Sequence, residues 1–227
     1  MPPIDDRGPG DRERWNSRYR TQTAVPDPPL ALRRMAHLLP NQGLAVDLAG
    51  GSGAGAIFLA SLGLSPVLVE VSEVALELAA TNMAAAGRTA TRGTTASGTA
   101  TRRLQTVQLD LSSCTLAEAL SVVATDVGPD GPPVAVVSCF HYLQRGLLQS
   151  VATDLPAGAI FACSIATVNN LERNERPSRR FLLEPGELKR LVVGRSDGET
   201  DLEVLHDHEG WNERAQHEAE LLVRKMG

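Results

Sequence analysis

The stretch LAVDLAGGSGAG, residues 44–55, reads as a buried strand that runs into a glycine-rich turn. Leu44–Leu48 is apolar except for Asp47, and Ala54 opens a helical pattern. Glycine lacks a Cβ, so the backbone here can turn tightly and approach the polar edge of a ligand. The pattern therefore predicts a nucleotide-binding turn between a strand and a helix. The alternative is a glycine-rich surface turn that binds nothing.

Asp47 indicates which kind of ligand would lie at this turn. Residues 51–56 fit the loose G-x-G-x-x-G/A pattern, in which backbone N–H groups and a helix N-terminus face a pyrophosphate. A carboxylate at the end of the strand would repel phosphates but suits a cationic cofactor. S-adenosylmethionine carries an ammonium and a sulfonium and no phosphate, so Asp47 favours it over a dinucleotide.

Two further apolar runs also end in acids. Residues 67–71 contain Glu70, about 20 residues beyond the glycines, where an acid accepts hydrogen bonds from ribose hydroxyls. The alternative is a solvated acid stabilised by the dipole of the following helix. Residues 104–109 precede Asp110. In a parallel sheet, Asp47, Glu70 and Asp110 would line one edge.

Strand-like and helix-like segments alternate along the chain. We expect strands at 44–49, 67–71, 104–109, 134–139, 159–166, 202–207 and 218–224, and helices at 11–19, 29–39, 54–62, 73–86, 116–124, 143–153 and 184–191. The last two strands are separated by a turn expected around Gly210. The predicted fold is α/β: a doubly wound, seven-stranded, mostly parallel sheet with a C-terminal antiparallel hairpin.

At this point the chain resembles the class I S-adenosylmethionine-dependent methyltransferases, in particular the tellurite-resistance-type small-molecule methyltransferases. That family's first motif reads D-L-A/G-C-G-x-G, and residues 47–53 read DLAGGSG, with Gly50 in place of cysteine. Its second strand ends V-D-x-S, and here Glu70 replaces the aspartate. The stretches RWNSRY (14–19), FHYLQR (140–145) and FLLEPGEL (181–188) support the narrower resemblance, which covers the chain from about Arg12.

The resemblance implies roles for individual residues. Asp47 and the glycine turn would hold the methionine moiety, Glu70 the ribose, and Asp110 with Leu111 the adenine. The cofactor-binding set is then Trp15, Tyr19, Asp47, Ala49, Gly51, Gly53, Glu70, Val71, Asp110, Leu111 and Phe140. His141 and Tyr142 would face the reacting methyl group as catalytic residues.

Some of these residues have plainer interpretations. His141 is otherwise a loop histidine without a chemical task, and the helix that carries Trp15, Arg18 and Tyr19 on one face is otherwise a terminal helix packed on the core. Arg145, Arg173 and Arg176 are candidates for binding an anionic substrate or are simply solvated.

The expected reaction is an in-line displacement of the sulfonium methyl by a small-molecule acceptor. A thiolate or an oxyanion of tellurium or selenium needs no general base, whereas an amine or hydroxyl would use His141. Three alternatives remain open at this point: a protein methyltransferase, a non-catalytic S-adenosylmethionine-binding protein, and a nicotinamide oxidoreductase.

Composition bounds the other properties. The 227 residues, 42% of them hydrophobic, suit a single domain over 11–227 after a disordered segment at 1–10. A flexible Thr/Ala/Gly-rich insertion is expected at about 87–103. The net charge of −5 argues against a nucleic-acid partner. Three cysteines without metal spacing predict free thiols and no metal site, and no apolar run is long enough for a membrane span, so we expect a cytoplasmic protein. The oligomeric state is not predicted.

Overall fold

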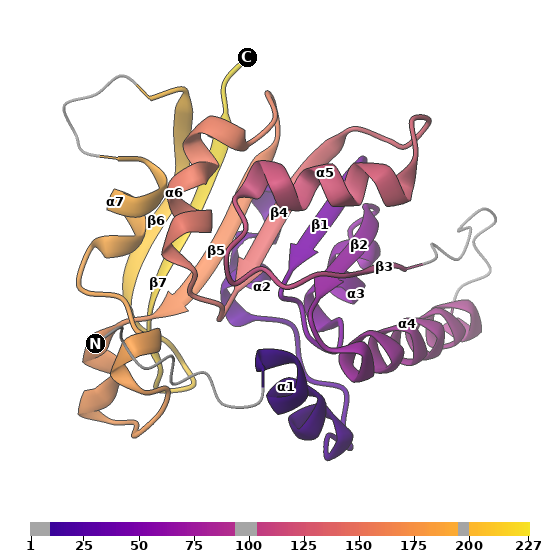
Figure 1. The fold of residues 1–227 in the computed structure, drawn as a ribbon, viewed down its shortest axis with the longest axis horizontal. Coiled ribbons are helices and arrows are strands. Elements are labelled where there is room, and N and C mark those ends of the chain that lie inside the picture. The colour runs from indigo at the N-terminus through magenta and orange to yellow at the C-terminus, as the bar shows by residue number, and fades with distance from the viewer. Residues whose placement is uncertain (1–9, 94–103, 195–199) are drawn as a thin grey trace, which may run out of the picture.

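The computed structural model describes residues 10–93, 104–194 and 200–227, with a seven-stranded sheet at its centre (Figure 1). The strand order is β3-β2-β1-β4-β5-β7-β6. The strands are β1 (Leu44–Leu48), β2 (Ser65–Glu70), β3 (Gln105–Gln108), β4 (Val134–Phe140), β5 (Ile160–Ala166), β6 (Leu202–Trp211) and β7 (His217–Lys225).

Pairing within the sheet divides it into two parts. The strands β1 to β5 pair in parallel, whereas β7 lies antiparallel between β5 and β6. From β1 the chain adds β2 and β3 on one side and then returns to add β4 on the other, so the strand order reverses between β1 and β4. The carboxyl ends of these two strands therefore border a crevice of the kind in which open α/β sheets bind ligands. This arrangement confirms the fold class predicted from the sequence.

Helices cover both faces of the sheet. The helices α5 (Leu116–Val127), α6 (Arg145–Asp154) and α7 (Glu187–Val192) lie on one face, in front of the strands in Figure 1. On the other face lie α2 (Leu30–Met35), extended by the 3-10 turn Ala36–Leu38, with α3 (Ala54–Ser61) and α4 (Glu73–Gly93). The strands of the sheet centre are buried on both sides, which explains their continuous apolar runs.

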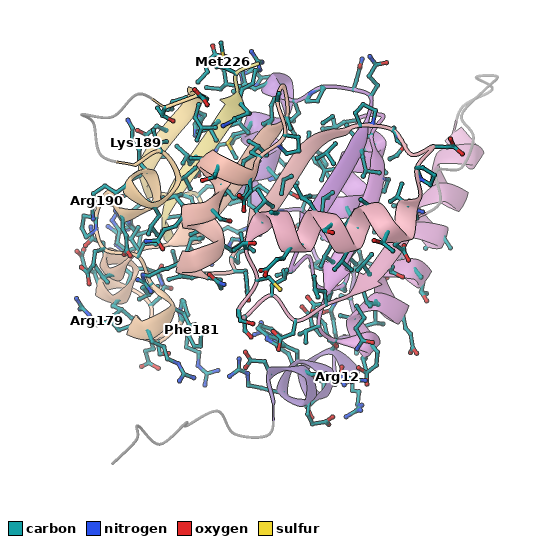
Figure 2. The ribbon with its side chains drawn as sticks, turned by 45° about the horizontal axis from the view of Figure 1, so that its top comes forward. Arg12, Arg179, Phe181, Lys189, Arg190 and Met226 are labelled. Carbon is teal, nitrogen blue, oxygen red and sulfur yellow. The ribbon has the colours of Figure 1, made fainter. Side chains whose placement is uncertain are left out.

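The helix α1 (Asp11–Arg20) belongs to neither layer. Figure 1 shows it below the sheet, next to the start of α4 and across the carboxyl ends of the central strands. Arg12, labelled in Figure 2, pairs with Glu73 at the start of α4 through Nε and Oε2, 2.7 Å apart. Contacts with the start of α4 therefore help to place α1.

Several boundaries differ from those expected, and three of them bear on the fold. The helix α4 continues to Gly93, into the segment expected to be a flexible insertion from Gly87, because nothing in residues 87–93 breaks a helix as proline would; residues 94–103 lie outside the described part, as do 1–9. The helix expected at 184–191 begins at Glu187, after Gly186 adopts a left-handed conformation (φ 65°). Gly210 lies within β6, and the hairpin turn follows at 212–216.

The cysteines, the potential metal ligands and the exposed apolar residues complete the description of the fold. All three cysteines are free, and Cys139 and Cys163 are buried side by side on β4 and β5. No helix among the described residues has the length and apolarity to cross a membrane, and no group of three or more potential metal ligands occurs among them. The exposed apolar residues Phe181 and Met226 lie at opposite ends of the molecule (Figure 2), so they do not form one patch.

Candidate active site

A cavity of about 350 Å³ lies between α1 and the carboxyl ends of β1, β2 and β4. The structure brings almost every residue predicted for the cofactor and for catalysis to this one place. Its lining includes Trp15, Tyr19, Asp47, Ala49, Gly51, Glu70, Val71, Asp110, Leu111, Phe140, His141 and Tyr142. These residues span five separate segments of the chain, so their convergence is a property of the fold.

Gly53 is the exception among the predicted residues. It has a left-handed conformation (φ 85°) at the start of α3 and does not line the cavity. A Cβ at Gly53 would lie 2.9 Å from the Cβ of Ala79, on α4. Its observed contribution is the close packing of the turn against α4, which the glycine pattern does not distinguish from a ligand contact.

Asp47 lies buried at the base of the turn. Its Oδ1 accepts a hydrogen bond of 2.6 Å from Ser138 Oγ on β4, whereas Oδ2 has no hydrogen-bond partner in the described structure. Burial raises the pKa of Asp47 to about 6; the Ser138 hydroxyl and the backbone N–H of Ala56 oppose this rise, and the charge of Glu70 adds to it. An incompletely satisfied buried carboxylate is costly, so its retention here needs an explanation.

The glycines next to Asp47 are small because the carboxylate occupies the space beside them. A Cβ on Gly50 would clash with Asp47 Oδ2, and one on Gly55 would lie 2.8 Å from the same oxygen. The turn is thus wrapped around the carboxylate. Ala49, which directly precedes Gly50, has a left-handed conformation (φ 52°), which is unfavourable for a residue with a Cβ.

Glu70 ends β2 and is 5% exposed. Its Oε2 accepts a hydrogen bond from the N–H of Gly51 (3.1 Å), and its Oε1 accepts from the N–H groups of Val71 (2.8 Å) and Ser72 (3.0 Å). Burial raises its pKa although these N–H groups oppose the shift. Glu70 therefore fixes the glycine turn to the end of β2, and its remaining lone pairs can accept further hydrogen bonds.

The helix α1 covers the cavity with aromatic side chains. The rings of Trp15 and Tyr19 stack with centroids 5.9 Å apart, and the guanidinium of Arg18 lies 5.1 Å from the Trp15 centroid. A Cβ on Gly51 would clash with the Tyr19 hydroxyl, so the ring lies directly on the turn. Burial, followed by the charge of Glu70, raises the pKa of Tyr19 to about 12. Tyr19 therefore remains a neutral hydroxyl over the turn.

Asn16 was not predicted and holds α1 in place. It is 1% exposed; its Nδ2 donates to Glu73 Oε1 (2.8 Å), and its Oδ1 accepts from Ser72 Oγ (2.6 Å). Ser72 Oγ in turn accepts from the N–H of Ala75 as the cap of α4. One signal in the sequence was available: Asn16 lies in the RWNSRY stretch, one residue after Trp15.

Asp110 and Leu111 border the cavity on the β3 side. Asp110 is exposed, and its Oδ1 accepts a 2.9 Å hydrogen bond from the N–H of Ser112. Leu111 is buried and packs in the core below. The two residues thus offer an apolar floor beside a fixed carboxylate.

The end of β4 forms the opposite wall. Phe140 is almost buried, and His141 follows it with a left-handed backbone (φ 59°) fixed by its N–H, which donates to the carbonyl of Ser164 (2.8 Å). His141 Nδ1 lies 3.3 Å from Oε1 of Glu218, on β7. Tyr142 packs partly into the core, and burial raises its pKa strongly. Of these two predicted catalytic residues, only His141 thus has a buried acid beside its side chain.

Glu218 was missed because its partner lies far away in the sequence. In β7 the acids Glu218 and Glu220 alternate with apolar residues, a pattern that normally indicates a solvent-facing side. Both acids are instead 2% exposed. The alternation alone does not reveal that His141 and Arg34, from other elements, meet them.

The arginines considered for substrate binding have other partners. Arg145 pairs with Glu187 (Nε to Oε1, 2.6 Å), and the Arg173 guanidinium lies 4.0 Å from the Trp211 ring centroid. Neither lines the cavity, nor does Arg176. Arg214 does, and it pairs with Asp27, another lining residue, at 2.9 Å.

Several solved structures with a similar fold are described as methyltransferases. An S-adenosylmethionine-dependent methyltransferase from Anabaena variabilis superposes with a TM-score of 0.59 at 17% identity, over 94% of this chain and 93% of that one. The fold of this chain is that of the S-adenosylmethionine-dependent methyltransferases. Magnesium protoporphyrin IX methyltransferase from Synechocystis, with bound S-adenosylhomocysteine, gives 0.57 at 16% identity, over 93% and 96%.

A third similar structure was solved in work on the conversion of a disulfide bond into a thioacetal in echinomycin biosynthesis; it gives a TM-score of 0.59 at 16% identity, over 95% and 91%. No family model and no curated sequence matches the chain. At these identities, the comparisons establish the fold.

Proposed function

We propose that this protein is a methyltransferase that uses S-adenosylmethionine and a small-molecule acceptor. The observation that carries the proposal is the pair of buried carboxylates, Asp47 and Glu70, at a glycine turn inside a covered cavity. Asp47 keeps one oxygen without a hydrogen bond, so its charge is poorly compensated until a cation occupies the cavity. A pyrophosphate at the same turn would meet repulsion.

The residues present fit such a cofactor in its separate parts. The negative potential behind the glycine turn suits the methionine ammonium and the sulfonium, and Glu70 suits the ribose hydroxyls. Leu111 and Asp110 suit the two sides of an adenine, apolar face and exocyclic amine. When bound, the cofactor supplies an electrophilic methyl group.

The protein's own contribution is placement and exclusion of water. Trp15 and Tyr19 on α1 cover the turn, and the Arg214–Asp27 pair lines the same cavity. Holding an acceptor atom in line with the methyl in such an enclosure lowers the barrier by removing the entropy of approach. Phe140 and His141 line the side on which the acceptor would lie.

The acceptor is proposed to be a thiol or an oxyanion of tellurium or selenium. The resemblance to tellurite-resistance-type methyltransferases favours this class, and the structural neighbour from the echinomycin work concerns sulfur chemistry. The three free cysteines suit a reducing compartment, which is part of the same proposal as a cytoplasmic location.

Calorimetry tests the proposal at its base. Purified protein is titrated with S-adenosylmethionine, with S-adenosylhomocysteine and with NADH. We expect micromolar binding of the first two and none of NADH. Binding of NADH alone would replace the proposal with an oxidoreductase. Binding of the adenosyl compounds without methylation of thiols, tellurite, selenite or a protein lysate would leave a non-catalytic binding protein.

A further inference from the structure

His141 and Glu218 meet at the cavity wall although 77 positions separate them. His141 follows β4, Glu218 lies in β7, and β5 runs between these two strands. Nδ1 and Oε1 are 3.3 Å apart. The side chain of Glu218 is 3% exposed and that of His141 51%, so a buried acid supports a histidine that is open to the cavity.

Glu218 is held as a carboxylate by three neighbours. Its Oε2 accepts hydrogen bonds from Ser164 Oγ and Asn212 Nδ2, each 3.1 Å long. Burial by itself would raise the pKa of Glu218, but these two bonds and the contact with His141 outweigh it and leave the pKa below its usual value. Oε1 is thus a fixed, ionised acceptor for Nδ1–H.

The backbone of His141 supports the same orientation. Its left-handed φ of 59° is uncommon for a residue other than glycine, and such conformations persist where surrounding structure imposes them. The imposing contact is the hydrogen bond from its N–H to the carbonyl of Ser164, the residue whose side chain also binds Glu218. Among the described residues, the contacts of His141 are made by its Nδ1 and its backbone N–H, and none is made by Nε2.

We propose that His141 and Glu218 form an acid–base pair for the methyl acceptor, and that the acceptor therefore carries a dissociable proton on its nucleophilic atom, as a thiol, hydroxyl or amine does. This rests on the proposed function. Glu218 is a positioning residue: it keeps the ring proton on Nδ1 and leaves the lone pair of Nε2 toward the cavity.

Methyl transfer to such an acceptor moves a proton as well as the methyl group. The acceptor atom forms a bond to the methyl carbon and gives its proton to Nε2 of His141. The bond from the methyl carbon to the sulfonium sulfur breaks, and its electron pair stays on that sulfur. The ring is then an imidazolium beside the Glu218 carboxylate and returns its proton to solvent. A fully ionised tellurium oxyanion would give this pair no proton to take.

Glu220 offers a matched control for Glu218. It lies two residues along β7 on the same face, is equally buried, and pairs with Arg34 and with His206 Nε2 (3.1 Å), away from the cavity lining. Removing either carboxylate takes a buried acid away from a basic side chain, but only Glu218 contacts His141.

The kinetic experiment compares Glu218→Gln, Glu220→Gln and His141→Gln in the full chain. Methyl transfer from S-adenosylmethionine is measured to 2-mercaptoethanol, an aromatic thiol, a catechol, a primary amine and tellurite. We expect turnover of a proton-bearing acceptor, a fall in kcat of about 10²-fold in Glu218→Gln with an unchanged Kd for S-adenosylhomocysteine, and little change in Glu220→Gln. Glu218→Asp should restore part of the rate. Equal rates in wild type and Glu218→Gln, or turnover of tellurite alone, would overturn the pair.

A second measurement decides the question even when none of these acceptors reacts. Imidazole ¹⁵N spectra at pH 8, with His141 assigned by its loss in His141→Gln, should show the neutral ring protonated on Nδ1 in the wild type and in Glu220→Gln, but not uniformly so in Glu218→Gln. A proton on Nε2 in the wild type would overturn the proposal. Because this readout needs no cofactor, it also separates failure of the pair from failure of cofactor binding.

Discussion

Buried acids beside the glycine turn and in the C-terminal hairpin are balanced in different ways. On the side of the glycine turn, Asp47 and Glu70 face backbone N–H groups and a serine hydroxyl. On the side of the hairpin, Glu218 and Glu220 face ionisable side chains, namely His141, Arg34 and His206. The first side therefore carries uncompensated negative charge. On the second side, Glu218 accepts hydrogen bonds from Ser164 and Asn212 and contacts His141, and Glu220 pairs with the Arg34 cation.

This difference indicates which side is suited to bind a cation. Burial raises the pKa of Asp47 and of Glu70, whereas the pKa of Glu218 is lowered. A site that destabilises its own carboxylates gains most from a positively charged ligand, and a site that has satisfied them is ready to act on a neutral one. We thus assign the cofactor to the glycine turn and the acceptor to the wall at the end of β4, where His141 contacts Glu218 of β7.

Asp47→Asn gives the largest expected effect. An unchanged affinity for the cofactor in this variant would contradict the difference between the two sides. We expect the affinity for S-adenosylmethionine to fall at least 100-fold, while the free energy of unfolding of the unliganded protein rises by up to about 3 kcal/mol, the equivalent of a pKa near 6. Calorimetry and urea unfolding at pH 8 measure the two. Retained affinity would remove Asp47 from the cofactor site.

The pH dependence of the wild type follows from the same group. Because the pKa of Asp47 in the folded protein, about 6, lies above that of an unfolded aspartate, the folded state binds more protons between about pH 4 and 6. The cost of burying this carboxylate is therefore complete above pH 6 and is relieved as the pH falls through 6. We expect the affinity for the cofactor to fall as the pH is lowered from about 6 to 4, because Asp47 loses its charge there. The affinity of Asp47→Asn should not depend on pH in this way.

Glu218→Gln should change stability in the opposite direction. Its lowered pKa means that the carboxylate stabilises the fold above the pKa of an unfolded glutamate, and that this contribution is lost as the pH falls through the folded-state value. We expect a loss of roughly 1–3 kcal/mol at pH 7 that shrinks at acid pH, measured by urea unfolding. A gain in stability at pH 7 would show that the two sides are not opposed.

Asn16→Ala should loosen the cover with a moderate effect. The variant leaves Ser72 and Glu73 without a buried partner, so we expect faster cofactor dissociation and an affinity about 10-fold lower. Arg12→Ala, which removes an exposed ion pair from the same helix, is the control and should change affinity by less than about threefold. Equal effects of both variants would mean that α1 is held by charge and not by the buried asparagine.

Ala49→Gly gives the smallest expected effect. Glycine removes the steric cost of a Cβ in the left-handed conformation, but it also has more backbone entropy to lose on folding. The free energy of unfolding should therefore rise by less than about 1 kcal/mol. Thermal unfolding measures it, and cofactor affinity should not change. A marked loss of affinity would assign the Ala49 methyl group a contact with the ligand.

The two sides also differ in how far the sequence alone predicts them. Asp47, the glycines and Glu70 lie within 24 residues, and the physics of a strand, a tight turn and a helix places them, so the fold and this half of the cavity were predictable. The His141–Glu218 contact depends on the pairing of β5 with β7, and Asn16 depends on where α1 settles. No local pattern contains such information. The extent of α4 and the hairpin turn were likewise set by the absence of a breaking residue and by the register of β6 with β7.

The most direct test titrates S-adenosylhomocysteine into the wild type, Asp47→Asn and Glu218→Gln side by side. The account predicts similar micromolar affinities for the wild type and Glu218→Gln and a loss of at least 100-fold for Asp47→Asn. Unaltered binding by Asp47→Asn, or an equal loss in both variants, would contradict the division of the cavity into a cofactor side and an acceptor side.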